Sequence, residues 1–233
     1  MAEPVTYARQ DDDLGLVTLD DGKVNAMSLR FFSALNAALD AAQRDEPRAL
    51  LITGRPGVFS AGLDLKLLPT LPTEQLQDTL RAFGRTMLRV FTFPIPTVAA
   101  VSGHAIAGGA MLMFACDLRH AADGPFRIHL NEVAIGLALP TWAIALAQAA
   151  VPPRWHTEAI LHARLYSPAE ALTREIVDRV APPERLLEVA RAAAAPLRTL
   201  DPKAYATAKA RHREPAVRWA SERLEPEITG PLR

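Results

Sequence analysis

The sequence predicts an α/β fold with a helical C-terminal tail. From the N-terminus to about residue 139, short apolar runs typical of buried strands alternate with segments whose apolar residues recur at helical spacing. From Pro140 onward no further β-rich segment is expected, and prolines separate short alanine-rich helices. With 49% hydrophobic and 22% charged residues among 233, the chain can bury a sizeable core, which excludes a disordered chain and a disulfide-stapled mini-protein.

The first elements are a hairpin, a helix and a strand. Residues 5–8 and 14–19 are predicted strands, joined by a turn of three aspartates. Ser28 can cap a helix with apolar residues at helical spacing, which the sequence Asp45-Glu46-Pro47 ends. Residues 49–53 form a short apolar strand, closed by a Gly-Arg-Pro-Gly turn.

The middle of the chain repeats this alternation. Residues 59–62 lead into a turn or helix start at Asp64, a helix follows from Pro72 to about Phe91, and 97–101 is a buried strand. We expect 102–109 to be a glycine loop that opens a helix over 110–116, with strands at 118–122 and 126–130. In the tail, Ser167-Pro168-Ala169-Glu170 is a capping box at the start of a helix.

Charge and cysteine content exclude several classes of partner and site. The 26 basic and 26 acidic residues give no net charge, which argues against nucleic acid or an anionic membrane as the main partner. A local anionic site stays open where Arg211, Arg213, Arg218 and Arg223 crowd together. One cysteine, Cys116, allows no internal disulfide and no cysteine-built metal site. Without a signal-peptide pattern or a long apolar run, we expect a soluble cytoplasmic protein.

Two small-residue turns are the first candidates for chemistry. The loop Gly103–Gly109 has the glycine spacing of a phosphate-binding loop but lacks its Lys and Ser/Thr, so it offers no phosphate or Mg²⁺ ligands. The second turn is Phe59–Asp64. Each turn could present one backbone N–H, and together they could form an oxyanion hole. The alternative is structural: glycines that permit tight packing, and Asp64 as a helix cap.

Four segments resemble the enoyl-CoA hydratase/isomerase (crotonase) superfamily in their order and spacing. They are Val24-Asn25-Ala26-Met27, Phe59-Ser60-Ala61-Gly62-Leu63-Asp64-Leu65, the glycine loop with Cys116-Asp117 at its end, and Ile128-His129-Leu130-Asn131-Glu132-Val133. The resemblance implies a spiral of ββα units over residues 1–180 and a helical trimerisation region over 181–233, assembled as homotrimers or dimers of trimers. It also implies acyl-CoA substrates, with coenzyme A as part of the substrate and no bound metal or resident cofactor.

The resemblance assigns roles to individual residues. Ala61 and Gly108 would be the two N–H donors that hold the thioester oxygen, and Glu132 would be the catalytic acid. The surface that seats coenzyme A would include Asn25, Ala26, Ala61, Gly62, Leu63, Asp64, Gly108 and Met111, with Lys66 in reach of a phosphate. The apolar residues that follow Glu132 are expected to raise the pKa of its carboxyl group.

One departure from the family pattern, at Met111, favours an isomerase. Met111 stands where the hydratases carry a second glutamate, and a thioether can neither give nor take a proton. Hydration needs a water held between two carboxylates, whereas moving a double bond from C3 to C2 needs only one acid. The segment around Glu132 is similar to that of the single-glutamate Δ3,Δ2-enoyl-CoA isomerases, except that His129 replaces a glycine and could narrow the acyl channel.

Two other functions stay open at this point. The first is a 2-enoyl-CoA hydratase that uses Glu132 alone, and the second is a non-catalytic acyl-CoA-binding homologue. His104, inside the glycine loop, is a weaker candidate for a base, since the family commonly carries a non-catalytic aromatic residue there.

Overall fold

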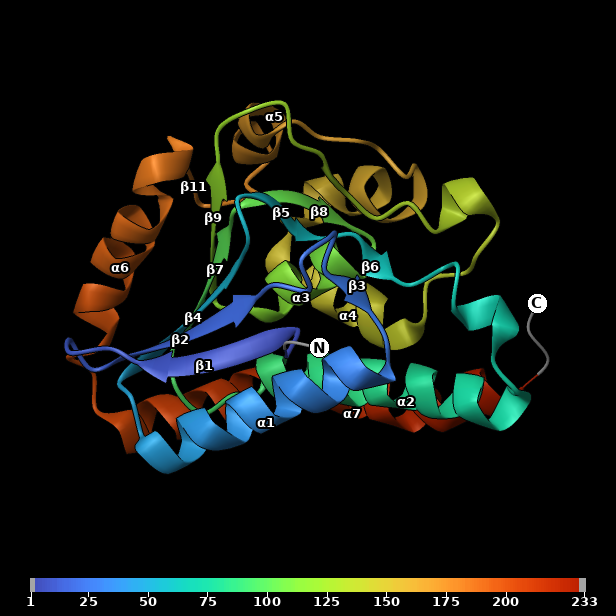
Figure 1. Ribbon diagram of the computed structural model, residues 1–233, viewed down its shortest axis with the longest axis horizontal. Coiled ribbons are helices and arrows are strands. Elements are labelled where there is room, and N and C mark those ends of the chain that lie inside the picture. The colour runs from blue at the N-terminus through green and yellow to red at the C-terminus, as the bar shows by residue number, and fades with distance from the viewer. Residues whose placement is uncertain (1–2, 231–233) are drawn as a thin grey trace.

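The structure is a computed structural model that describes residues 3–230, and it contains one large sheet, two small sheets and seven α-helices within that range (Figure 1). The strands are β1 Val5–Arg9, β2 Leu14–Leu19, β3 Ala26–Met27, β4 Ala49–Gly54, β5 Gly57–Ser60, β6 Gly62–Leu63, β7 Thr97–Val101, β8 Gly103–Ile106, β9 Leu118–Ala122, β10 Ile128–His129 and β11 Arg179–Ala181. The α-helices are α1 Leu29–Asp45, α2 Thr73–Phe91, α3 Gly108–Ala115, α4 Thr141–Ala150, α5 Pro168–Thr173, α6 Leu186–Leu197 and α7 Pro202–Thr229. Single turns of 3₁₀ helix lie at η1 Leu68–Thr70, η2 Val133–Ile135, η3 Pro153–Trp155 and η5 Pro183–Arg185, and a π-helical turn at η4 Thr157–Leu161.

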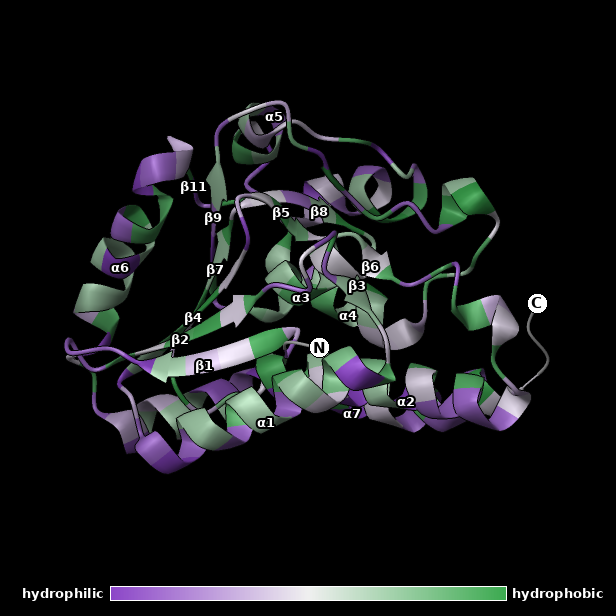
Figure 2. Ribbon diagram, in the orientation of Figure 1, coloured by the Kyte–Doolittle hydropathy of each residue, from purple (hydrophilic) through white to green (hydrophobic). Residues whose placement is uncertain are grey.

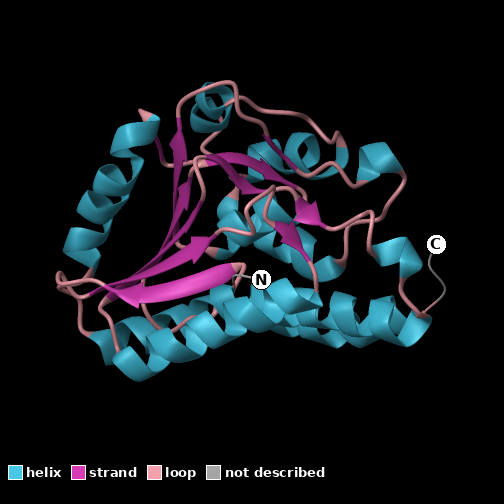
Figure 3. Ribbon diagram, viewed as in Figure 1, coloured by secondary structure: helices cyan, strands magenta, loops and turns pink. Residues whose placement is uncertain are grey.

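The large sheet has the strand order β1-β2-β4-β7-β9-β11, and all of its pairs except β1–β2 are parallel. Helix α6 covers one face, while α1, α2, α3 and α4 lie toward the other, so strands lie between helical layers (Figure 3). In β4, Leu50 and Ile52 face the larger core cluster, and Ala49 and Leu51 face the cluster under α6. Burial on both faces explains why these strands appear in the sequence as unbroken apolar runs.

The chain repeats a unit of two strands and a helix, as the resemblance implied. Strand β2 of the large sheet is followed by short β3 and then α1, and β7 is followed by β8 and then α3. The short strands form two further sheets, of order β10-β8-β5 and β3-β6. These small sheets bring the ends of successive units together near α3.

Several predicted elements are confirmed with their caps. Helix α1 ends at Asp45, and at its start the N–H of Phe31 donates to Oγ of Ser28 at 3.4 Å. The capping box is present as well, since the side chains of Ser167 and Glu170 each bond the other's backbone N–H. Helix α2 and strand β7 occupy the predicted ranges.

Three predictions about secondary structure are wrong. Residues 103–106 form strand β8 rather than a loop, because Gly103 lets β8 lie so close to β5 that a Cβ there would be 1.9 Å from the carbonyl carbon of Gly57. The predicted strand over 126–130 is reduced to β10. The tail contains a strand, β11, and its last helix runs for 28 residues through Pro215 and Pro226.

Both helices of the region 181–233 pack on the rest of the chain. Leu186, Ala190 and Ala194 of α6 belong to the core cluster under the large sheet, and α7 contacts α2 and α4. In Figure 2 the outer surfaces of α1, α2 and α7 carry many hydrophilic residues, as expected for helices with one buried face. A role of this region in trimerisation stays a prediction.

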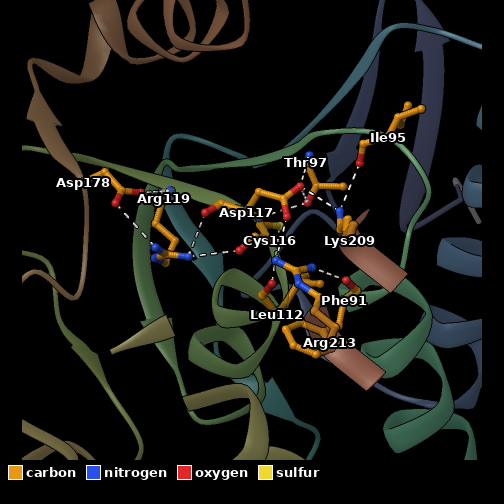
Figure 4. A network of polar contacts seen from close by, with 10 residues as sticks. All are labelled: Phe91, Ile95, Thr97, Leu112, Cys116, Asp117, Arg119, Asp178, Lys209 and Arg213. Carbon is orange, nitrogen blue, oxygen red and sulfur yellow. Dashed lines mark hydrogen bonds and ion pairs between the residues drawn. The ribbon is translucent and has the colours of Figure 1, made fainter. Parts of the chain in front are cut away.

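A buried ionic network ties α7 to the core (Figure 4). Asp117 accepts from Nζ of Lys209 at 2.7 Å and from Nη2 of Arg213 at 2.6 Å, and both cations lie one helical turn apart on α7. Asp117 also accepts from the N–H of Thr97 at 2.7 Å, and Arg213 lies over the ring of Phe91 with its guanidinium carbon 4.1 Å from the ring centre. Arg213 therefore belongs to an internal network and not to the anionic-ligand site that the arginine cluster suggested.

Candidate active site

The two small-residue turns meet at backbone distance beside α3. A Cβ on Gly62 would lie 2.7 Å from the amide nitrogen of Gly108, and a Cβ on Gly108 would lie 3.2 Å from the Cα of Gly62. Gly62 also has a φ of +80°, which favours glycine. Strand β6 contacts α3, and both lie near the centre of the molecule in Figure 1. The expected meeting of the two turns is therefore present.

The amide of Ala61 is already engaged within the protein. Its N–H donates to the carbonyl oxygen of Val24 at 3.0 Å. The next N–H, of Gly62, donates to Oγ of Ser60 at 3.0 Å, and that hydroxyl donates to the carbonyl of Asn25 at 2.7 Å. The prediction that Ala61 supplies an oxyanion donor is therefore wrong, because a donor bound to a protein carbonyl is not available to a substrate oxygen. Sequence reasoning also missed Ser60, whose buried hydroxyl links the backbone of Asn25 to the backbone of Gly62.

The amide of Leu63 points to the other side of β6. The N–H of Asp64 donates to the carbonyl of Met27 on β3 at 3.0 Å, and Leu63 lies opposite Met27 in this parallel pair. Successive amides along a strand point to opposite sides, so the N–H of Leu63 points away from β3. It is the amide of this turn that the pairing with β3 does not use.

Gly108 is the first residue of α3, and the first amides of a helix have no partner within it. The preceding residue, Ala107, has a φ of +52° and donates its N–H to the carbonyl of His129 on β10 at 2.9 Å. This strained backbone at Ala107 fixes the direction in which α3 begins. The N–H of Gly108 thus lies at a helix N-terminus, where the helix dipole favours negative charge.

Glu132 is held near these amides by the small sheet. Strand β10 pairs in parallel with β8, with His129 opposite Ile106, and β8 leads directly into Ala107 and Gly108. Glu132 follows shortly after β10 and begins the turn η2. Pairing of β10 with β8 therefore brings Glu132 and Gly108 to the same end of this small sheet.

The carboxyl group of Glu132 is buried, and its surroundings shift its pKa. The residue is 8% exposed, and its Oε2 has no hydrogen-bond partner among the described residues. Burial raises the pKa of Glu132, while the amides of Glu132 and Asn131 act in the opposite direction. The predicted direction is confirmed, but its stated cause is wrong: Val133 and Ile135 are 45% and 47% exposed and point away from the core.

Met111 lies one turn into α3 and is 1% exposed. Its side chain belongs to the main core cluster, as a thioether at a buried helical position should. No ionisable side chain therefore occupies this position beside the glycine turn.

His104 is engaged within the protein. Its Nδ1 accepts a hydrogen bond from the N–H of Arg127 at 3.1 Å, and its ring packs edge-on against Phe126.

The predicted coenzyme A surface is only partly exposed to a ligand. Asn25 is fully buried, and its Nδ2 donates to the carbonyls of Leu19 and Phe59 at 2.9 and 3.0 Å, so this side chain shapes the turn. The N–H of Ala26 donates to Asp21 at 3.1 Å. Lys66 is exposed and begins the segment that leads to η1, where its N–H donates to Asp64.

A cavity of about 430 Å³ leads toward the two turns. It is lined by Val24, Val58, Ala61, His104, Ile106, Pro125 and Arg127. Ala61 belongs to the same turn as Leu63, and Ile106 lies two residues before Gly108, so the cavity lies beside both turns. A cavity of this size with a mainly apolar lining and a few polar groups is typical of a small-molecule site.

Gly62→Ala should lower kcat/KM by about 10²–10³-fold, because its Cβ would push the Gly108 amide out of position and removal of one oxyanion donor costs this much in other enzymes. The matched control is Gly22→Ala, since Gly22 has a similar φ of +76° but no atom within 4 Å of the added Cβ. Steady-state kinetics of both variants test this. Equal losses in the two variants would attribute the effect to backbone strain alone.

Within the described residues, no helix combines the length and apolarity needed to cross a bilayer, and no group of three or more acidic, His or Cys side chains is arranged to hold a metal ion.

Comparison with known proteins points to one family. Residues 9–229 match the family model described as enoyl-CoA hydratase/isomerase. The human mitochondrial enoyl-CoA delta isomerase 1 is 34% identical over 175 residues, which are 74% of this chain and 58% of that relative, so the match spans less than two thirds of its length.

Two solved structures cover nearly the whole chain. The enoyl-CoA isomerase of Mycobacterium tuberculosis has a TM-score of 0.91 and 35% identity over 99% of this chain and 100% of its own. An enoyl-CoA hydratase of Mycobacterium ulcerans has a TM-score of 0.90 and 36% identity over 96% of this chain and 97% of its own. The chain described here belongs to the enoyl-CoA hydratase/isomerase family.

Proposed function

We propose that the protein is a Δ3,Δ2-enoyl-CoA isomerase. The observation that carries this proposal is one buried carboxyl group, Glu132, whose Oε2 has no partner in the described part of the chain, at the end of the sheet where Gly108 begins α3. Position 111, where a second acid would be needed for hydration, holds a buried methionine. The name of the human relative, an enoyl-CoA delta isomerase, supports the same reaction, whereas the Mycobacterium tuberculosis protein is named an isomerase in one solved structure and a probable enoyl-CoA hydratase in another.

The reaction needs one oxyanion site and one acid. The N–H groups of Leu63 and Gly108 hold the thioester oxygen of a 3-enoyl-CoA, and the carboxylate of Glu132 removes a proton from C2. The electron pair moves toward the carbonyl and gives an enolate, which the two amides stabilise. Glu132 then returns the proton to C4, so that the double bond moves from C3 to C2 and substrate and product are isomers.

The test is direct. Purified protein with a 3-enoyl-CoA should give 2-enoyl-CoA, followed by ultraviolet absorbance of the conjugated thioester. A preparation that binds the substrate but leaves its double bond in place would refute the isomerase assignment.

Hydration of 2-enoyl-CoA is the second candidate, because the Mycobacterium ulcerans neighbour is named a hydratase. In this chain Glu132 would have to both activate water and protonate C2. Turnover of crotonyl-CoA to its 3-hydroxy product well above background would favour this function over isomerisation.

The pH dependence of kcat/KM should reflect the raised pKa of Glu132. The carboxylate form is the base, so activity should fall as pH drops through that pKa, and burial places the acidic limb above the ordinary glutamate value of about 4.3. A pH–rate profile measured in buffers of constant ionic strength checks this. An acidic limb at or below the ordinary value would contradict it.

We further propose that the protein assembles as homotrimers or as dimers of trimers, with residues 181–233 at the contact. Sedimentation equilibrium should give three or six times the mass of one chain. A monomer at micromolar concentration would refute the assembly and leave the chemistry of the site untouched.

A further inference from the structure

One face of the small β10-β8-β5 sheet forms a wall of the cavity that leads to the candidate active site. Strand register places Val58 opposite His104 and His129 opposite Ile106. Side chains directly opposite each other in a sheet point to the same face, as do alternate residues along a strand. Arg127 precedes β10 by one residue and is also part of the cavity lining, so it lies on this face, at the end away from Gly108.

Arg127 is fixed at its backbone and free at its side chain. Its N–H donates to Nδ1 of His104 at 3.1 Å, and its carbonyl accepts from the N–H of Ala105 at 2.9 Å. The residue is exposed, and no carboxylate among the described residues pairs with its guanidinium, whereas most arginines of this chain form such pairs. A guanidinium without a carboxylate partner among the described residues, at the rim of a mainly apolar cavity, is suited to an anionic group of a bound ligand.

The reach of the substrate fits this position. Gly108 lies four residues along the chain from His104, so their Cα atoms are at most about 14 Å apart, the span of four fully extended residues. In an acyl-CoA, about fourteen bonds connect the thioester carbonyl carbon to the first phosphorus, which corresponds to about 16 Å of extended chain at the reach of a polypeptide. With its thioester at Gly108 and its pantetheine arm along the cavity, the substrate therefore brings this phosphate within reach of the long Arg127 side chain.

We propose that Arg127 binds the pyrophosphate of coenzyme A and thereby selects nucleotide-bearing thioesters. This proposal rests on the proposed acyl-CoA function. It assigns the phosphate contact to Arg127, a residue that none of the family-like motifs includes. Lys66 takes no part in it, because that residue lies in the segment after β6 and does not contribute to the cavity lining.

The experiment is a binding cycle measured by calorimetry, with two proteins and two saturated thioesters that cannot react. The unchanged protein and Arg127→Gln are each titrated with hexanoyl-CoA and with hexanoyl-pantetheine, which lacks all phosphates. Arg127→Gln should weaken hexanoyl-CoA about tenfold, as expected for loss of a charge-assisted contact at a partly solvated site, and leave hexanoyl-pantetheine unchanged. Arg127→Lys should lie between the two, because lysine keeps the charge but not the two-pronged geometry.

Further arms locate the contact. Arg44→Gln, at an exposed arginine in the last turn of α1 and outside the cavity lining, is the matched control and should leave both affinities unchanged, while Lys66→Gln tests the alternative phosphate contact. Hexanoyl-4′-phosphopantetheine, which keeps the phosphate nearest the arm, should retain most of the Arg127 effect. An Arg127→Gln loss that appears with hexanoyl-CoA but not with hexanoyl-3′-dephospho-CoA, which keeps the whole pyrophosphate, would move the contact to the 3′-phosphate and overturn the pyrophosphate assignment.

The remaining outcomes decide between this proposal and the function on which it rests. Equal losses for both thioesters, no loss at all, or a loss in Lys66→Gln alone would refute the role of Arg127. If the unchanged protein fails to bind hexanoyl-CoA, the acyl-CoA function itself is refuted, and the Arg127 contact with it. Because no turnover is measured, a protein that binds but does not isomerise leaves the Arg127 result valid.

Discussion

Glu132→Gln should lower the rate of isomerisation by about 10²–10⁴-fold, the usual contribution of a positioned proton-transfer group. The amide has the shape of the carboxyl group but cannot take a proton from C2. The loss should appear in kcat, while the affinity for hexanoyl-CoA changes little. Turnover by this variant at the rate of the unchanged protein would reject Glu132 as the proton shuttle.

The same variant should be more stable above the pKa of Glu132. Because burial raises this pKa in the folded protein, the folded state holds the proton more tightly than the unfolded chain does. The resulting stability is present at low pH and is lost as pH rises through the folded pKa. Glutamine avoids the cost of a buried carboxylate, so thermal unfolding near neutral pH should shift upward, while a downward shift would show a structural role for Glu132.

Asp117→Ala should lower the free energy of unfolding by about 3–5 kcal/mol, because it leaves the buried cations of Lys209 and Arg213 without their partner. For a chain of this size that corresponds to a fall of roughly 10 °C in Tm. Thermal unfolding measures the loss, and amide hydrogen exchange in α7 should rise more than in the large sheet. A variant whose Tm changes by less than a degree or two would show that the network contributes little.

The control for this variant is Glu188→Gln. Glu188 pairs with Arg185 at 2.8 Å, but both side chains are more than half exposed, and solvent screening leaves exposed pairs of this kind with little effect on stability. Burial acts to raise the pKa of Asp117, but the charges of Lys209 and Arg213 outweigh it and the pKa is lowered. Stability from Asp117 is therefore present above the ordinary aspartate pKa and is lost as pH falls through the lowered one.

Local signals in the sequence predicted the elements that have strong local causes. Ser28 and Ser167 cap helices because their side chains satisfy N–H groups within the same turn, and β7 is apolar because both of its faces are buried. Strands β3, β5, β6, β8 and β10 were missed or misjudged because they are two to four residues long, and what stabilises them is pairing with segments far along the chain.

Long-range contacts also explain the errors in the tail and the site. Pro215 cannot donate a helical hydrogen bond, yet α7 continues through it. Before the proline, Lys209 and Arg213 bind Asp117. After it, Ala220 and Leu224 pack in the core. In the same way, a motif can show that a turn supplies an amide, but not that the Ala61 N–H is taken by Val24. Which donor is left depends on hydrogen bonds between segments that lie far apart in the chain.

An amide that acts through its backbone makes little demand on the side chain beside it. If Leu63 contributes only its N–H, evolution is free to vary that position while the chemistry stays the same, and proline, which has no hydrogen on its nitrogen, is the one residue that chemistry itself forbids. A different residue at this position in a homologue would then not indicate that the homologue catalyses a different reaction. Saturation mutagenesis at position 63 should therefore give variants that keep their activity with most residues and lose it with proline.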